Sequence, residues 1–152
     1  MNRLFRFLAT LGPVGYVPAS GTVATLVAVP LVWAMEDLSA ADYLLVSGIL
    51  LFASFWIIQR ALNAFEVKNH DPSEIVLDEV VGFVFLFNFI PITPLSIVLA
   101  FLLFRFFDIV KPLGIKRCEN LVGSIGVVVD DLLAGFYAGG ILALCIVVLE
   151  YF

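Results

Sequence analysis

The chain has 152 residues, a length that suits one domain, and we predict a single domain over residues 1–152. Hydrophobic residues make up 62% of it and charged residues only 14%, whereas soluble proteins are about half apolar and about a quarter charged. With a net charge of −5, this composition argues against a soluble protein and predicts an integral membrane protein with no nucleic-acid partner. Neither a disulfide framework nor a zinc site is indicated by the cysteines, Cys118 and Cys145.

The N-terminal stretch resembles a signal peptide at its start, where Arg3 and Arg6 precede apolar residues. Glycines and prolines interrupt residues 12–18, so we interpret this stretch as part of the mature protein. A first helix is predicted over residues 22–35, with a kink where Pro30 removes a backbone hydrogen bond.

The second and third predicted helices begin at recognisable capping sequences. Ser39 and Asp42 have the spacing of a capping box, which predicts a helix from residue 39 past residue 60. The third helix is predicted over residues 71–90. Its start combines a capping side chain, a proline suited to the first helical position and an acidic residue that can reach back, namely Asp71, Pro72 and Glu74.

The fourth and fifth predicted helices cover residues 94–111, which end before Pro112, and residues 124–150. A membrane-spanning helix needs about 20 mostly apolar residues, and long charge-free runs recur through the chain: residues 7–35, 43–59, 80–104 and 132–149. These runs are too continuous for the alternating strands of a barrel. The sequence therefore predicts an all-α integral membrane protein, a bundle of about five membrane-embedded helices.

Polar residues gather at one membrane face of this bundle. Because consecutive spans alternate in direction, the starts of the first, third and fifth helices share a face with the ends of the second and fourth. All 8 Lys and Arg residues fall on that face, and the opposite face carries only acidic residues. The excess of basic residues predicts that this face is cytoplasmic.

A group of carboxylates from three helices lies near that face: Asp78, Glu79, Asp108, Asp130 and Asp131. They cannot all be ionised side by side without a cation. Hard oxygen ligands favour Mg²⁺, and neighbouring residues on a helix point in different directions, so one member of each adjacent pair could support the site rather than bind the ion. Ionisable residues inside a bundle indicate a functional site.

Two basic residues accompany the carboxylates. Arg105 lies on the same helical face as Asp108, and the pair is either a structural ion pair or a site in which Arg105 grips phosphate while Asp108 holds metal. Lys111 either adds a second positive charge to the site or extends to the membrane interface.

The start of the first helix offers a further phosphate contact. Backbone N–H groups at Gly21 and Thr22 could bind phosphate, although Thr22 could equally be a plain helix cap. His70, the one histidine, is either a general acid or a solvated loop residue.

Two alternative functions use the same carboxylates. In a small ion or metal transporter, polar residues would continue across the membrane, but residues 83–90, 95–103 and 141–149 are apolar. A structural subunit that docks a partner through its acidic face would show no metal dependence. We therefore favour metal-assisted transfer of a phosphoryl group, with a carboxylate as general base.

Four segments, in order and over nearly the whole chain, resemble the phosphatidylglycerophosphatase A family: residues 18–22 (PASGT), 71–82 (DPSEIVLDEVVG), 104–112 (FRFFDIVKP) and 126–135 (GVVVDDLLAG). The resemblance implies a multi-pass, magnesium-dependent phosphatase of the bacterial inner membrane, with its active site facing the cytoplasm. It implies hydrolysis of the phospholipid phosphatidylglycerophosphate to phosphatidylglycerol and phosphate. It also implies functional roles for Asp78, Glu79, Arg105, Asp108, Lys111, Asp130 and Asp131.

Overall fold

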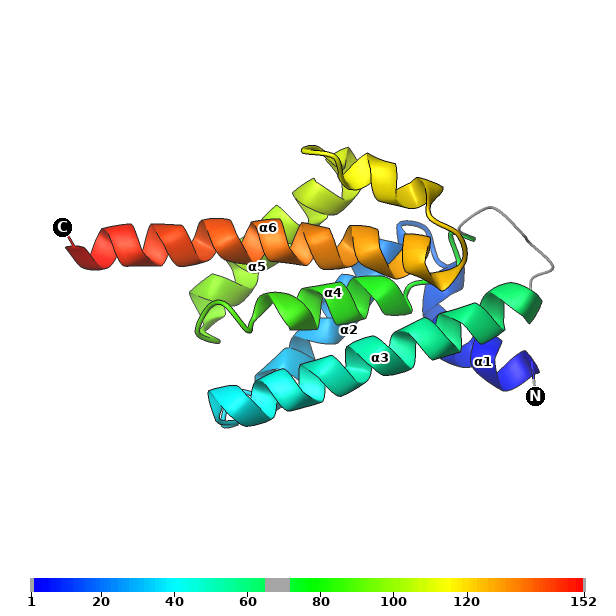
Figure 1. Ribbon diagram of the computed structural model, residues 1–152. Helices are drawn as coiled ribbons and strands as arrows, with labels where there is room; N and C mark the ends of the chain where they lie inside the picture. The colour runs from blue at the N-terminus through cyan, green and yellow to red at the C-terminus, as the bar shows by residue number, and fades with distance from the viewer. Residues whose placement is uncertain (1, 65–71, 152) are drawn as a thin grey trace.

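The computed structural model describes residues 2–64 and 72–151, and within these ranges every regular element is helical (Figure 1). Six α-helices and two short 3-10 helices follow one another: α1 (Asn2–Ala9), η1 (Val14–Tyr16), α2 (Ser20–Ala34), α3 (Ala40–Ala64), α4 (Leu77–Leu86), α5 (Pro94–Val110), η2 (Ile115–Asn120) and α6 (Ser124–Tyr151).

The short helix α4 lies at the centre of the bundle. It packs against α2, α3 and α6, and α5 covers another side of α6 (Figure 1). Phe83, Val84 and Leu86 of α4 are fully buried and form the middle of the main hydrophobic core. Helix α1 packs across the end of α3, where Ala9 joins a second, smaller core cluster. The central position of α4 leaves its N-terminal end facing the ends of several other helices.

Glycines bring α4 and α6 into backbone contact. A Cβ atom added to Gly135 of α6 would stand 2.4 Å from the carbonyl oxygen of Gly82 in α4. A Cβ atom added to Gly82 would stand 2.7 Å from the carbonyl oxygen of Asp131. Small residues at such positions let helices approach closely and gain packing contacts. The two helices are therefore held together at the level of Asp131.

Four of the predicted helices are confirmed: α2, α3, α5 and α6 begin and end within a few residues of the expected positions. The predicted capping box at the start of α3 is present in part: the amide of Asp42 donates to the Ser39 hydroxyl, while the Asp42 carboxylate accepts from that hydroxyl. Helix α5 ends before Pro112, with Lys111 in a left-handed conformation. The capping residues at the start of α3 and the proline after α5 thus predicted these helix ends from local sequence.

The third predicted helix is wrong at both ends, since α4 begins at Leu77 and ends at Leu86. The segment before it is not helical because its hydrogen bonds go elsewhere: the amide of Val76 donates to the carbonyl of Ala9 at 3.0 Å. Asp78 is thus the second residue of its helix, whereas a helix that began at residue 71 would have placed it well inside. The predicted cap Asp71 and the loop residue His70 lie outside the described residues. Helices α1, η1 and η2 were not expected from the sequence.

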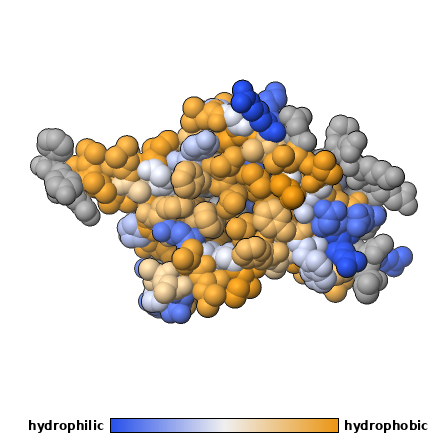
Figure 2. All heavy atoms as spheres, in the orientation of Figure 1, coloured by the Kyte–Doolittle hydropathy of each residue, from blue (hydrophilic) through white to orange (hydrophobic). Residues whose placement is uncertain are grey.

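Two helices in the described ranges are long and apolar enough to cross a membrane, Ala40–Asn63 and Ser124–Leu149. Ser20–Ala34 is a shorter apolar helix, and α4 has 10 residues, about 15 Å against a hydrocarbon core of about 30 Å. The expectation of about five membrane helices is therefore not confirmed. Apolar side chains nevertheless dominate the visible surface, and hydrophilic ones gather mostly towards its edges (Figure 2).

The glycine contact between α4 and α6 predicts a stability difference within one helix. Gly135→Ala should lower the free energy of unfolding by about 1–3 kcal/mol, because a methyl group has no room beside the Gly82 carbonyl. Gly140→Ala is the matched control, since no atom lies within 4 Å of its added Cβ. Thermal unfolding in detergent should show a lower midpoint for Gly135→Ala alone, and equal midpoints would contradict the contact.

Candidate active site

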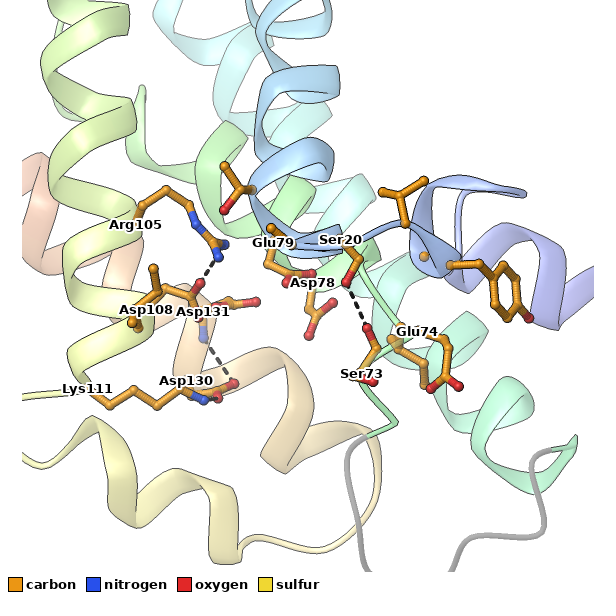
Figure 3. A pocket seen from close by; sticks show the side chains of 18 residues that line it. Ser20, Ser73, Glu74, Asp78, Glu79, Arg105, Asp108, Lys111, Asp130 and Asp131 are labelled. Carbon is orange, nitrogen blue, oxygen red and sulfur yellow. Dashed lines mark hydrogen bonds and ion pairs between the residues drawn. The ribbon is translucent and has the colours of Figure 1, made fainter.

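One pocket of about 700 Å³ opens where the starts of α2, α4 and α6 meet the end of α5 (Figure 3). Its walls also include η1 and the turn before α4. The side chains that Figure 3 labels around it are Ser20, Ser73, Glu74, Asp78, Glu79, Arg105, Asp108, Lys111, Asp130 and Asp131. Segments far apart in the sequence therefore contribute to a single polar cavity.

Three carboxylates form the acidic cluster of this pocket: Asp78 and Glu79 at the start of α4, and Asp131 on α6. Each offers an oxygen, and these oxygens lie within 4.8 Å of one another. Asp78 and Asp131 are buried. Oε2 of Glu79 and Oδ1 of Asp131 are also buried and find no hydrogen-bond partner among the described residues.

Such a cluster suits a divalent cation. Buried carboxylates repel one another and lose their hydration, so they are stable as anions only when a positive charge neutralises them. The set consists of hard oxygen donors, which Mg²⁺ prefers and which Zn²⁺ sites rarely use alone. The unsatisfied oxygens of Glu79 and Asp131 are available as ligands, so these residues fit the magnesium ion that the sequence led us to expect.

Two ion pairs border the acidic cluster, and both join α5 to a carboxylate. Nη1 of Arg105 lies 2.5 Å from Oδ2 of Asp108, one turn along the same helix. Nζ of Lys111 donates to Oδ2 of Asp130 at 2.5 Å. Asp108 and Asp130 are thus neutralised within the protein, and the remaining negative charge lies on the acidic cluster. Lys111 contacts the pocket rather than extending away from it (Figure 3).

An unusual backbone conformation at the end of α5 places Lys111. Lys111 has φ 48° and ψ 50°, in the left-handed region that residues with a Cβ rarely adopt. The following Pro112 disfavours continuation of the helix through Lys111. Strained positions of this kind cost about 1–3 kcal/mol and persist where surrounding contacts hold them. Here the ion pair with Asp130 is such a contact.

The start of α2 meets the acidic cluster at a glycine. A Cβ atom on Gly21 would stand 2.1 Å from Oε1 of Glu79 and 3.0 Å from Nη1 of Arg105. The α2 backbone therefore lies directly against both side chains. The interpretation of Thr22 as a helix cap is wrong, because α2 begins at Ser20 and its N-cap is Ala19, which makes no side-chain capping bond.

All of the predicted site residues line this pocket: Gly21, Thr22, Asp78, Glu79, Arg105, Asp108, Lys111, Asp130 and Asp131. The structure adds lining residues that sequence reasoning did not assign to the site, among them Tyr16, Ser20, Ser73 and Glu74. Ser20 stands beside the glycine that was noticed, and Glu74 was interpreted only as a helix cap. Their proximity depends on how the segment before α4 folds back, which no local pattern reveals.

Comparison with known proteins places the chain among phosphatases. The family model for phosphatidylglycerophosphatase A matches residues 7–146. A phosphatidylglycerophosphatase A of Haemophilus influenzae is 35% identical over 124 residues, which cover 80% of this chain and 75% of that protein. One from Escherichia coli is 31% identical over 124 residues, which cover 80% of this chain and 71% of that protein. The chain belongs to the phosphatidylglycerophosphatase A family.

A third relative carries a different name. A protein of Bacteroides thetaiotaomicron, provisionally named phosphatidylinositol-3-phosphatase, is 39% identical over 95 residues. The match covers 57% of this chain, and the chain spans 55% of that relative's length. No solved structure matches the chain. The relatives thus agree on a phosphatase that acts on a lipid phosphate and differ in the alcohol that carries the phosphate.

The contact at Gly21 predicts a variant that folds but turns over slowly. Gly21→Ala should displace the Glu79 carboxylate, since the added methyl group would overlap Oε1, and a misplacement of about 1 Å can lower the rate about 10²-fold. Gly48→Ala is the control, because nothing lies within 4 Å of its added Cβ. Phosphate release and thermal unfolding should be measured together. Full activity of Gly21→Ala would show that the Glu79 position is unimportant.

Proposed function

We propose that the protein hydrolyses phosphatidylglycerophosphate to phosphatidylglycerol and phosphate in a magnesium-dependent reaction. The observation that supports this proposal is the acidic cluster of Asp78, Glu79 and Asp131 beside the cations Arg105 and Lys111. Membership of the family supports a lipid phosphate as substrate, and two of the relatives are named for this activity. The whole arrangement lies in one pocket at the ends of the helices.

The acidic cluster would hold Mg²⁺ through Asp78, Glu79 and Asp131. Bound there, the ion would neutralise part of the cluster and polarise the phosphoryl group of the substrate. A carboxylate oxygen of the cluster that does not contact the ion takes up the proton of the attacking water, as a general base. The pocket is open enough for a headgroup yet keeps Asp78 and Asp131 away from bulk water.

Arg105 and Lys111 hold the phosphate oxygens. The guanidinium of Arg105 provides a planar fork of N–H donors that matches a phosphate. Its Nε is buried and has no hydrogen-bond partner among the described residues, so Arg105 retains a donor beyond its pair with Asp108. Donors fixed in this way stabilise the negative charge that develops on the phosphoryl oxygens during transfer. Backbone N–H groups at Gly21 and Thr22 add a contact from the start of α2.

The pocket faces the cytoplasm in this proposal, and the protein is a multi-pass protein of the bacterial inner membrane. The sequence assigns the Lys and Arg residues to the same membrane face as the predicted site residues, which supports this orientation. Two helices have the length and composition of membrane spans. A lipid headgroup would then enter the pocket at the level where its phosphates lie, while its acyl chains stay in the membrane.

Phosphate release by the purified protein tests the activity and its metal together. We expect turnover of phosphatidylglycerophosphate with Mg²⁺, loss of turnover with excess chelator, and recovery when Mg²⁺ is restored, because the buried carboxylates need a cation to bind an anionic substrate. Phosphatidylinositol 3-phosphate should be assayed in parallel, given the name of the third relative. Full activity in excess chelator would refute the proposed magnesium dependence. Inactivity on phosphatidylglycerophosphate would refute the proposed substrate.

Substitutions in the Arg105–Asp108 pair separate phosphate binding from packing. Arg105→Lys keeps the charge but loses the fork, so kcat should fall about 10²–10³-fold while the protein stays folded. Asp108→Asn removes the partner carboxylate and should also lower kcat. If Arg105→Lys retains most of the activity while Asp108→Asn is inactive, Arg105 serves only to hold α5 in place, and the phosphate is bound by other groups.

A further inference from the structure

The pocket divides into two halves with different chemistry. Its basic lining residues in the described ranges are Arg105 and Lys111, and both belong to α5. The opposite half is formed by η1, the first turn of α2 and the segment before α4, which supply Tyr16, Ser20 and Glu74. Figure 3 shows Ser20, Ser73 and Glu74 together on the far side of the acidic cluster from Arg105 and Lys111. One half therefore suits a phosphate, and the described residues that line the other half include no Lys or Arg side chain to bind one.

The segment that carries Glu74 is fixed in place by contacts on both sides. The hydroxyl of Ser20 donates to the carbonyl of Ser73 at 3.0 Å, and the amide of Val76 donates to the carbonyl of Ala9 at 3.0 Å. The backbone of Glu74 lies against Gly15, whose added Cβ would stand 2.0 Å from the Glu74 carbonyl oxygen. Groups held by their surroundings in this way bind a ligand without first becoming ordered.

Two side chains of this half, those of Ser20 and Glu74, accept hydrogen bonds. An ionised Glu74 carboxylate is an acceptor only. Ser20 uses its hydroxyl hydrogen in the bond to Ser73, which leaves the oxygen of Ser20 as an acceptor. A phosphate also brings only acceptors when it is fully ionised, so it is disfavoured here by charge and by hydrogen bonding. The ligand that fits is one that brings donors, and in the glycerol and inositol headgroups for which the relatives are named these are alcohol hydroxyls.

The size of the pocket agrees with this division. A volume of about 700 Å³ lies in the range of sites that enclose a whole small molecule, about 300–1,000 Å³. With a phosphate between the acidic cluster and α5, the space beside Ser20 and Glu74 would receive the atoms next to that phosphate. In a lipid phosphate these atoms belong to the alcohol that carries it.

We propose that Glu74, together with Ser20, forms a hydroxyl-binding subsite that selects lipid phosphates carried on a polyol such as glycerol or inositol. This inference rests on the proposed phosphatase function and adds a specificity determinant to it. Glu74 binds a free hydroxyl next to the phosphate ester in the substrate and in the transition state. It takes no part in transferring the phosphoryl group.

The test compares phosphatidylglycerophosphate with a synthetic analogue that lacks the free hydroxyl of its headgroup glycerol. Removing Glu74 with Glu74→Ala should lower kcat/KM for the hydroxylated lipid about 10- to 100-fold, the usual effect of losing a hydrogen bond to a charged group. The value for the deoxy analogue should stay unchanged, so the ratio of the two should fall by the same factor. Glu74→Gln keeps one acceptor oxygen and should recover part of the ratio.

Glu36→Ala, an exposed acidic substitution beyond the other end of α2, is the control and should leave both values unchanged. An unchanged substrate ratio in Glu74→Ala would overturn the inference while the wild-type activity upholds the phosphatase function. An equal loss on both lipids, accompanied by a higher magnesium requirement, would also overturn it and assign Glu74 to the cation. If the wild-type protein cleaves neither lipid, the proposed function itself fails.

Discussion

The backbone contact between α4 and α6 determines the position of the acidic cluster. Gly82 and Gly135 allow the two helices to approach until only hydrogen atoms fit between them, and the carbonyl of Asp131 lies against Gly82. Asp131 is thereby brought within reach of Asp78, which stands one turn before Gly82 on α4. A larger residue at either glycine would separate the two carboxylates. The chemistry of the pocket therefore depends on a packing contact that contains no charged atom.

Two carboxylates of the pocket are paired with cations, so the repulsion between carboxylates is concentrated in the acidic cluster. Arg105 pairs with Asp108 within α5, and Lys111 pairs with Asp130, which joins the end of α5 to α6. Breaking a buried pair by removing one partner leaves an uncompensated charge, which destabilises a protein strongly. The carboxylates of the acidic cluster repel one another, and burial strengthens this repulsion because water screens it little. A cation would suit the carboxylate oxygens of Glu79 and Asp131 that have no hydrogen-bond partner among the described residues, and a phosphate would suit the Arg105 donor that has none.

The sequence was sufficient to locate the long helices and the site residues, but not the shape of the site. Apolar runs mark α2, α3, α5 and α6, and the acidic and basic residues near their ends converge on one pocket as expected. The start of α4 was misplaced because Asp71, Pro72 and Glu74 have the composition of a helix start, while the amide of Val76 pairs with the distant Ala9. That pairing, and the role of Glu74 in the pocket wall, depend on non-local contacts that periodicity does not encode.

The position of Asp131 in the last helix also constrains the order in which the protein can assemble. During synthesis, α4 and α5 emerge before α6, so Asp78 and Glu79 exist for a time without Asp131 and without the glycine surface of α6. The short α4 buries its apolar residues against α6 as well as α2 and α3, and it is too short to cross a bilayer alone. Final docking of α4 must therefore wait for the C-terminal helix. A ribosome that stalls before residue 131 would release a chain that contains most of the pocket's side chains but no complete pocket.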